Sequence, residues 1–310
     1  MRRFDLETQS ARERSLIEAL EGGAGLSVVP PFPLKVQVQT KTLCNAACTM
    51  CPYPVVADAL EHGEMSLALF DRLLGELEGR GVERLSLFLM NEPLLDLRLP
   101  EFVRRTKGRL PDTATVIFTN GSALTERTAR ALHAAGLDEV NLSVHGFDEA
   151  AYESVMVGLS YERLRRNLRR LLELRRSGEL PGLRVKLVAV DLPAVLGSLE
   201  ERDRDLFAEV LVKATSNERD AIAGEGEAPR RRPCQRPFVK AYVLFNGDLV
   251  LCNVDWRRSV ILGNVAREPI EAIWRSARYR AVRSQHLAGA FEPGLLCAGC
   301  DYPAVTAEDD

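Results

Sequence analysis

With 310 residues, the chain can bury a sizeable core, as one large domain or as a large domain with a small one. Its formal net charge of −3 gives no electrostatic reason to expect nucleic acid or an anionic membrane as a partner. Residues 1–25 contain no apolar signal segment, and no run approaches the roughly 18 apolar residues of a membrane helix. Seven cysteines in clusters favour a reducing compartment and metal ligation over disulfides, so we expect a cytoplasmic protein.

Residues 5–22 are predicted to form a charged amphipathic helix, after which strand and helix patterns alternate. The expected strands are Leu34–Thr40, Glu83–Leu89, Ala114–Thr119, Glu139–Val144, Leu183–Val190 and Ala208–Lys213. The expected helices are Leu67–Gly79, Leu99–Arg109, Glu126–Ala135, Tyr161–Arg176 and Leu192–Leu206. Such alternation predicts an α/β fold with a parallel sheet and helices outside it. Six units are too few for the eight-stranded barrel, so we expect an open, partial (β/α)6 barrel.

Several of these strands alternate polar with apolar residues, although parallel strands buried on both faces are usually apolar throughout. The polar positions are Lys35, Gln37, Gln39, Asn141, Ser143, His145, Arg184 and Lys186. Because helices are expected on the other face, these side chains are predicted to face the interior, where they would suit a polar cofactor and substrate. A solvated sheet face is the alternative.

Three cysteines, Cys44, Cys48 and Cys51, lie on a loop directly after the first predicted strand, with the spacing C-x3-C-x2-C. Thiolates are the usual ligands of iron–sulfur clusters, and a four-iron cluster normally takes four of them. Three thiols would leave one iron open to a ligand such as the amine and carboxylate of an amino acid. A zinc site or three buried thiols are the alternatives, but zinc favours paired C-x2-C hooks at a longer separation.

The chain changes character after residues 221–233, whose composition is typical of a linker. Asn246-Gly247 between Phe238–Phe245 and Asp248–Val254 predicts a hairpin, and a helix is expected over Glu268–Ser284. Four cysteines in this module can fill all the sites of a second cluster, with structural zinc as the alternative: Cys234, Cys252, Cys297 and Cys300. We therefore expect an N-terminal lead-in, a barrel, a linker and a small hairpin-plus-helix iron–sulfur domain, over residues 1–33, 34–220, 221–233 and 234–310.

The first cysteine motif, at its position after the first strand, resembles that of the radical S-adenosylmethionine (SAM) superfamily. Met90-Asn91-Glu92-Pro93 ends the second strand, where that family has Gly-Gly-Glu-Pro, so Glu92 and Pro93 match and the two glycines do not. The resemblance implies two [4Fe–4S] clusters, SAM bound at the open iron, and an external one-electron reductant such as flavodoxin or ferredoxin. One electron would then cleave SAM to methionine and a 5′-deoxyadenosyl radical. The implied SAM contacts are Met50, Asn91, Glu92, Asn120 and Ser143.

The last four cysteines resemble the short "twitch" version of the SPASM auxiliary-cluster domain. Their spacing is similar to that of radical SAM dehydrogenases that oxidise a secondary alcohol on a cyclitol. The two sets account for all seven cysteines, whereas a related radical epimerase needs a spare thiol to return hydrogen. We therefore expect net dehydrogenation of an alcohol on a small sugar, cyclitol or nucleoside-like substrate in natural-product biosynthesis.

Three residues are candidates for catalysis or substrate binding. His145 is a possible base, Lys186 faces the predicted interior, and Arg219 resembles a substrate-contacting arginine of such dehydrogenases. Two alternatives remain open within enzymes, a peptide-modifying maturase and an epimerase. A third alternative, in a different class, is an iron–sulfur electron-transfer protein without SAM chemistry.

Overall fold

The structure is a computed structural model that describes residues 10–190, 203, 211–215 and 234–300. One nine-stranded sheet runs through these residues in the order β6-β5-β4-β3-β2-β1-β7-β8-β9. Neighbours from β6 to β7 are parallel, and the pairs β7–β8 and β8–β9 are antiparallel. The strands are β1 Lys35–Val38, β2 Arg84–Ser86, β3 Ala114–Thr119, β4 Glu139–Ser143, β5 Arg184–Val190, β6 Leu211–Thr215, β7 Lys240–Val243, β8 Asp248–Val250 and β9 Ile261–Asn264.

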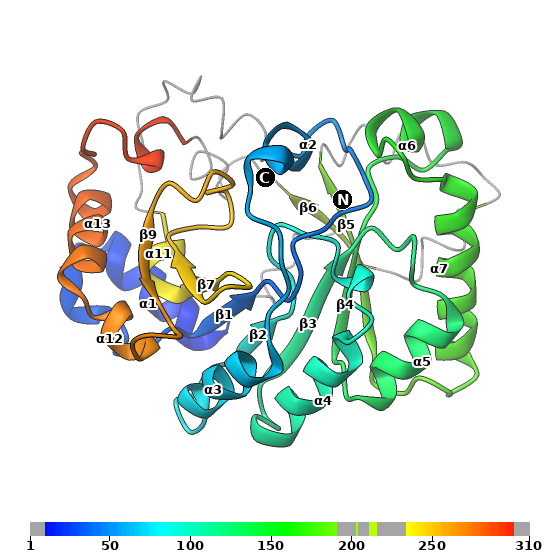
Figure 1. Ribbon diagram of the computed structural model, residues 1–310, viewed down its shortest axis with the longest axis horizontal. Helices are drawn as coiled ribbons and strands as arrows, with labels where there is room; N and C mark the ends of the chain where they lie inside the picture. Colours follow the sequence, from blue (N-terminus) through cyan, green and yellow to red (C-terminus); the bar gives the residue numbers. More distant parts are fainter. Residues whose placement is uncertain (1–9, 191–202, 204–210, 216–233, 301–310) are drawn as a thin grey trace.

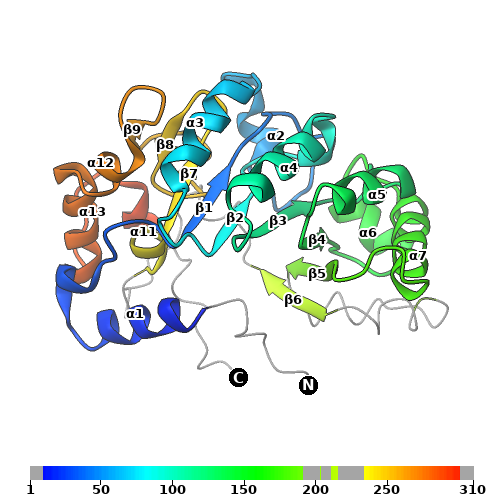
Figure 2. The same ribbon diagram turned by 90° about the horizontal axis from the view of Figure 1, so that it is seen from below.

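Helices follow most of the parallel strands and lie along the outer side of the curved sheet, as α3, α4, α5 and α7 show in Figures 1 and 2. Ser66, Thr125 and Ser160 begin α3, α5 and α7 by accepting a hydrogen bond from a backbone N–H of the first turn. The α-helices are α1 Ala11–Glu21, α2 Tyr53–Val56, α3 Leu67–Leu77, α4 Leu99–Arg109, α5 Glu126–Ala134, α6 Glu149–Val155, α7 Tyr161–Arg176, α11 Arg236–Val239, α12 Ile270–Trp274 and α13 Ala277–Ala288. The 3-10 helices are η2 Gly25–Val28, η3 Ala57–Ala59, η4 Pro93–Leu95 and η6 Leu296–Gly299.

The apolar side chains of the strands pack on the helices, as the alternating pattern predicts. Val36 and Val38 of β1 are completely buried in one core with Phe70 and Leu73 of α3. Seven buried positions along α7 continue this helix layer on the outer side of the sheet. The expected α/β architecture with a partial parallel barrel is confirmed.

Ion pairs fill the inward face of the sheet near the start of its strands. Glu139, the first residue of β4, is 1% exposed and receives Arg84 at 3.3 Å, Arg184 at 3.2 Å and Lys186 at 3.4 Å. Lys35 at the start of β1 pairs with Glu13 of α1. The polar positions of these strands are therefore partly used to neutralise one another inside the protein.

The C-terminal module departs from its predicted form in three ways. Strand β7 pairs in parallel with β1, so the hairpin extends the barrel sheet, and β9 adds a strand that was not predicted. The helix expected over Glu268–Ser284 is two helices. The first ends at Trp274, and Ser276 then caps α13 by accepting a hydrogen bond from the backbone N–H of Tyr279. Strand β6 is described over Leu211–Thr215, and it continues two residues beyond the predicted end at Lys213. Residues 208–210 of that prediction and the helix expected over Leu192–Leu206 lie outside the described residues.

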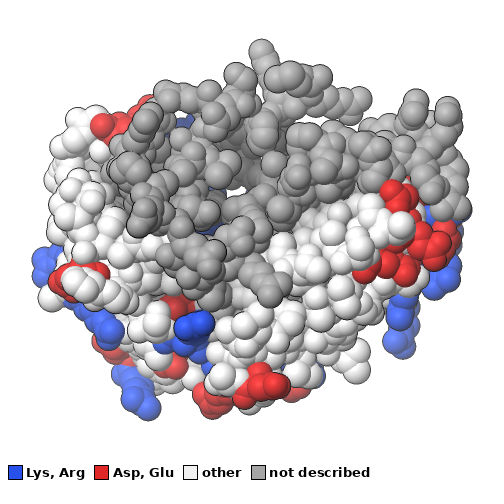
Figure 3. Space-filling model, turned by 90° about the horizontal axis from the view of Figure 1, so that it is seen from above, with Lys and Arg blue, Asp and Glu red and all other residues white. Residues whose placement is uncertain are grey.

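Charged side chains of both signs occur around the rim of the described surface when the molecule is seen from above (Figure 3). This agrees with the small net charge of −3. Within the described part of the chain, no helix has the length and apolar character needed to cross a membrane.

Candidate active site

The three cysteines of the first motif lie on the long loop between β1 and α3. Each of Cys44, Cys48 and Cys51 is partly exposed, and the backbone N–H of Cys51 donates to the carbonyl of Cys48 at 3.0 Å. Burial raises the pKa of the Cys44 thiol to about 12 and that of Cys48 to about 11. Because metal ligation requires thiolates, cluster binding at this loop must displace protons.

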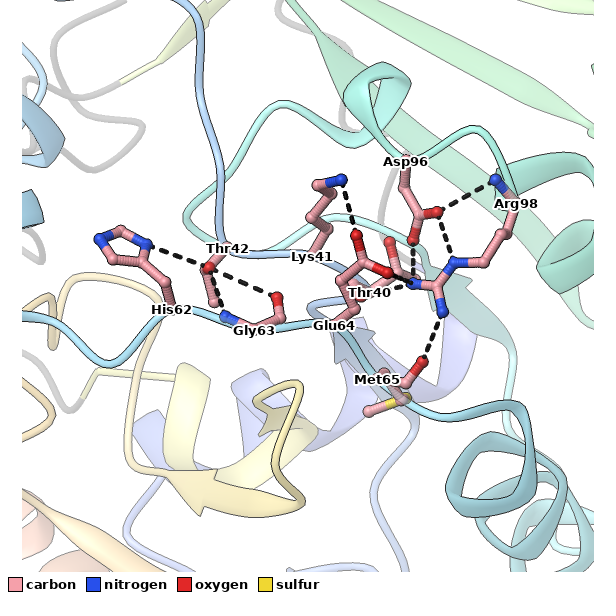
Figure 4. Close-up of polar contacts among 9 residues, drawn as sticks. All are labelled: Thr40, Lys41, Thr42, His62, Gly63, Glu64, Met65, Asp96 and Arg98. Atoms are coloured by element: carbon pink, nitrogen blue, oxygen red, sulfur yellow. Dashed lines mark hydrogen bonds and ion pairs between the residues drawn. The ribbon is translucent and has the colours of Figure 1, made fainter.

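The base of this loop is closed by pairing between its two ends (Figure 4). Lys41 and Glu64 form an antiparallel bridge and an ion pair of 2.7 Å. The backbone N–H of Thr42 donates to the Gly63 carbonyl at 3.1 Å, and the Gly63 N–H donates to Thr42 Oγ1 at 2.9 Å. The cysteines are therefore carried on a closed loop whose two ends are joined by hydrogen bonds.

Arg98 clamps both ends of the loop from the turn before α4. Its Nη1 donates to the Met65 carbonyl at 3.1 Å, and its Nη2 lies 3.5 Å from the Thr40 carbonyl (Figure 4). Asp96, which is 3% exposed, fixes the guanidinium with contacts of 2.8 Å and 2.9 Å. Neither Asp96 nor Arg98 is part of a recognisable motif, so sequence reasoning missed both residues.

Glu92 joins the cysteine loop to the end of β3. Its backbone N–H donates to the carbonyl of Leu43, the residue before Cys44, at 2.8 Å. Its buried carboxylate accepts from Thr119 Oγ1 at 2.6 Å, the Asn120 N–H at 2.8 Å and the Leu94 N–H at 3.0 Å. Burial raises the pKa of Glu92 to about 7, although these hydrogen bonds oppose the shift.

Both the nitrogen and the oxygen of the Asn120 side-chain amide form hydrogen bonds with other residues of the chain. Its Nδ2 donates to Asn45 Oδ1 at 2.9 Å, and its Oδ1 accepts from the Ser122 N–H at 2.9 Å. Asn45 in turn donates to Ser122 Oγ at 3.0 Å. Asn45, the residue directly after Cys44, is thus tied to the loop after β3.

Met90 occupies the position where the radical SAM motif has its first glycine, and its backbone adopts a conformation that glycine favours. Its φ of 55° lies in the left-handed region that glycine adopts freely. The Met90 side chain is 3% exposed and packs in a second core with Tyr53, Tyr242 and Trp256. The turn therefore keeps a glycine-like backbone, and packing of the methionine offsets the conformational strain.

Several buried polar atoms near the loop have no hydrogen-bond partner among the described residues. They include the hydroxyl of Tyr152 on α6, Asn91 Nδ2 and Gln39 Oε1. Tyr152 is completely buried, and the charges that act on its hydroxyl include those of Cys48 and Glu92. Unpaired buried groups of this kind fit a polar ligand such as SAM. Sequence reasoning missed Tyr152, which stands among residues that read as an ordinary amphipathic helix.

The other candidate residues are placed in different surroundings. Met50 is half-buried on the cysteine loop, and Ser143 is half-buried at the carboxyl end of β4. His145 follows β4, and burial lowers its pKa to about 4. Lys186 is bound to Glu139 near the start of the strands, which does not favour a substrate role. Arg219 lies outside the described residues.

The second set of cysteines surrounds one small cavity in the C-terminal module. Its lining includes Cys234, Arg236, Cys252, His286, Cys297 and Cys300. Cys234 precedes α11, Cys252 follows β8, and Cys297 lies on η6. Helix η6, red in Figure 1, lies along the same upper edge of the molecule as α2, which follows Cys51. The fold therefore gathers four thiols from three separate segments of the chain around a common space.

The donor set, four thiols around one cavity, is a set that a four-iron cluster takes. No three His, Cys, Asp or Glu side chains among residues 10–190, 203, 211–215 and 234–300 converge where one ion could bind. In a cubane each thiolate binds a different iron, so its thiols stand apart around the cluster. Four thiols around one cavity agree with that arrangement.

Comparison with known proteins agrees with this geometry. Residues 38–186 match the Radical SAM superfamily, and residues 234–301 match the SPASM iron–sulfur cluster-binding domain. The SAM-dependent 2-deoxy-scyllo-inosamine dehydrogenase of Niallia circulans is 24% identical over 276 residues, which are 88% of this chain and 95% of that protein. The GTP 3′,8-cyclase of Chlorobaculum tepidum is 34% identical over 155 residues, or 49% of this chain and 43% of the cyclase.

Solved structures share the fold at low sequence identity. BtrN in complex with AdoMet and 2-DOIA has a TM-score of 0.56 at 21% identity, over 83% of this chain and 88% of BtrN. SuiB of Streptococcus suis bound to precursor peptide SuiA has a TM-score of 0.61 at 15% identity, over 94% of this chain and 74% of SuiB. The two family matches imply SAM, a radical SAM [4Fe–4S] cluster and an auxiliary cluster as cofactors. Through residues 38–186 the chain belongs to the radical SAM superfamily, and through residues 234–301 it carries a SPASM domain.

Proposed function

We propose that this radical SAM enzyme dehydrogenates an alcohol on a small polar substrate, such as a sugar, cyclitol or nucleoside-like compound, in natural-product biosynthesis. When bound, the first cluster and SAM supply a radical that removes one hydrogen atom, and the second cluster supplies an acceptor for one electron. An external one-electron reductant, of the flavodoxin or ferredoxin type, is the protein partner that this chemistry requires.

The division of the cysteines carries this proposal. Three thiols lie on the loop after β1 and four surround the C-terminal cavity, which accounts for all seven cysteines of the chain. No thiol remains to return a hydrogen atom to the substrate, as inversion of a carbon centre requires. Oxidation balances without one: a hydrogen atom leaves carbon, a proton leaves the hydroxyl, and one electron passes to the acceptor.

The chain's own residues have distinct parts in this scheme. The first three cysteines hold the SAM cluster, and Glu92 positions their loop against β3 through Leu43, Thr119 and Asn120. The unpaired groups of Asn91 and Tyr152 are the proposed contacts to SAM, together with Met50 and Ser143 from the sequence motif. In this scheme the side chains of Glu92 and Asn120 act by positioning, because their hydrogen bonds lie within the chain.

His145 is the proposed base for the hydroxyl proton. Because burial lowers its pKa to about 4, the imidazole is neutral at neutral pH, which is the form that can accept a proton. The same low pKa makes it a weak base. It can therefore take the hydroxyl proton only as the carbinol carbon loses its hydrogen atom. Lys186 and Arg219 have no part in this proposal.

Isotope tracing tests the reaction type. The probe is 2-deoxy-scyllo-inosamine, deuterated at the carbinol carbon, with deuterated aminosugars and other cyclitols as a panel. We expect deuterium to enter 5′-deoxyadenosine and remain there, with one SAM consumed per ketone formed. Solvent deuterium at the reacting carbon would instead show a hydrogen-returning reaction, and catalytic use of SAM would show a rearrangement. Either result would overturn the dehydrogenase proposal.

A peptide substrate is the second candidate. The PqqA peptide cyclase of Xanthomonas euvesicatoria is 34% identical to this chain over 130 residues. That match spans 42% of this chain and 34% of the cyclase, whereas the match to the dehydrogenase spans 95% of that relative. The fuller match favours the small substrate. Deuterium transfer from a labelled peptide, with none from any cyclitol or aminosugar, would reverse that choice.

A further inference from the structure

A buried arginine lies among the four cysteines of the C-terminal cavity. Arg236, on α11, is 6% exposed and lines the same cavity as the thiols. Its Nη1 donates to Cys252 Sγ at 3.3 Å, and its backbone N–H donates to the sulfur of Cys234. One residue therefore places a permanent positive charge and two hydrogen bonds against two of the four cluster ligands.

The charge beside the first cysteine set has the opposite sign. The charged neighbour that acts on the thiols of both Cys44 and Cys48 is the carboxylate of Glu92. Hydrogen bonds to the sulfurs and local charge are among the properties that set the reduction potential of an iron–sulfur cluster. Reduction adds a negative charge, which a cation stabilises and a carboxylate opposes.

We propose that Arg236 raises the reduction potential of the auxiliary cluster and so makes it an electron acceptor. Arg236 is therefore a positioning residue and not a catalytic one, because it acts on the potential of the cluster through Cys234 and Cys252. This inference deepens the proposed function, but it concerns the cluster alone and holds for any substrate.

Electrostatics give the size of the expected change. A charge within about 4–6 Å of an ionisable group changes its equilibrium by about 10- to 1000-fold. We take the lower limit, because a cluster spreads its charge over several atoms. Loss of the guanidinium should then reduce the affinity of the auxiliary cluster for an electron at least tenfold, which is about 59 mV for a one-electron couple.

The test is a redox titration of the auxiliary cluster followed by electron paramagnetic resonance. It uses the full chain with Cys44, Cys48 and Cys51 replaced by alanine, so that only the auxiliary cluster gives a signal. Arg236→Met removes the charge, and Arg236→Lys keeps it. The matched control is Arg283→Met, because Arg283 is also buried in this module but packs on the rings of Trp274 and Tyr279 at 4.1 Å and 4.0 Å.

We expect a potential at least about 59 mV lower in Arg236→Met, a smaller shift in Arg236→Lys, and little shift in Arg283→Met. An unchanged potential in Arg236→Met would overturn the proposal, and so would equal shifts in Arg236→Met and Arg283→Met. Loss of the cluster from both Arg236 variants would also overturn it, by showing that the arginine assembles the site. None of these measurements uses SAM or substrate, so failure of the dehydrogenase proposal would leave this test intact.

Discussion

Replacing Arg98 with alanine should open the loop that carries the first three cysteines. The change removes the donors to the Met65 and Thr40 carbonyls and leaves the buried carboxylate of Asp96 without its guanidinium. Removing one partner of a charged hydrogen bond costs about 1.5–3 kcal/mol. The Arg98 side chain is 34% exposed, so water compensates in part, and we expect a loss of about 2 kcal/mol.

This loss should appear locally, because the clamp joins the two ends of one loop. A change of about 2 kcal/mol alters the equilibrium between the closed and open loop about 30-fold. Hydrogen–deuterium exchange of the apo protein, read by mass spectrometry, measures that equilibrium as faster exchange across residues 41–65. In the reconstituted protein, the same opening should speed iron release to EDTA from the first cluster but not from the auxiliary cluster.

Arg104→Ala is the matched control, since Arg104 lies on α4 and pairs with Glu101 at the surface. An exposed pair of this kind contributes about 0.2–1 kcal/mol, so exchange across residues 41–65 should stay close to that of the unmodified chain. Arg98→Lys should fall between the two, because it keeps the charge but loses the planar fork. Equal exchange in Arg98→Ala and Arg104→Ala would refute the clamp.

Three other predictions concern Met90, Glu92 and the cysteines. Met90→Gly should resist urea about 1 kcal/mol better than Met90→Ala, because both lose the packing but only glycine relieves the left-handed backbone; the reverse order would contradict the assigned φ of 55°. Because the folded protein raises the pKa of Glu92 to about 7, Glu92 favours folding below pH 4.5, and this contribution is lost as pH rises to about 7. The stability of the apo protein should therefore fall by up to about 3 kcal/mol more than that of Glu92→Gln over this range, and parallel pH profiles would count against it. Reconstituted protein should hold about eight irons, and the Cys44/Cys48/Cys51→Ala variant about four, whereas zinc in that variant would exclude an auxiliary cluster.

The barrel was predictable because its strands and helices have strong local patterns. Strand β3 is Ala114–Thr119 and helix α4 is Leu99–Arg109, both as predicted from the sequence. The end of β6 at Thr215, two residues beyond the prediction, was not predictable, since pairing with Val190 at the end of β5 sets how far the strand extends. The parallel pairing of β7 with β1 joins segments about 200 residues apart, which no local pattern reports.

Some residues of the candidate site could likewise be identified from the sequence, and others could not. The cysteines are recognisable because their spacing is part of the chemistry, and Glu92 because it follows a strand within a motif. Arg98 and Tyr152 depend on contacts that only the folded chain creates, with Met65 and with the surroundings of Cys48. Lys186 looked like an interior functional residue, but the sequence does not show that Glu139 of the neighbouring strand lies beside it.

A single-turnover experiment tests the central claim most directly, that the four C-terminal cysteines hold the electron acceptor of a net oxidation. The oxidised protein is mixed with SAM, a substrate that it oxidises, and less than one equivalent per chain of a one-electron reductant. Electron paramagnetic resonance then reports the state of the auxiliary cluster beside the measured yields of 5′-deoxyadenosine and product. We predict one reduced auxiliary cluster for each 5′-deoxyadenosine and each oxidised product. Formation of product while the auxiliary cluster stays oxidised would contradict the account.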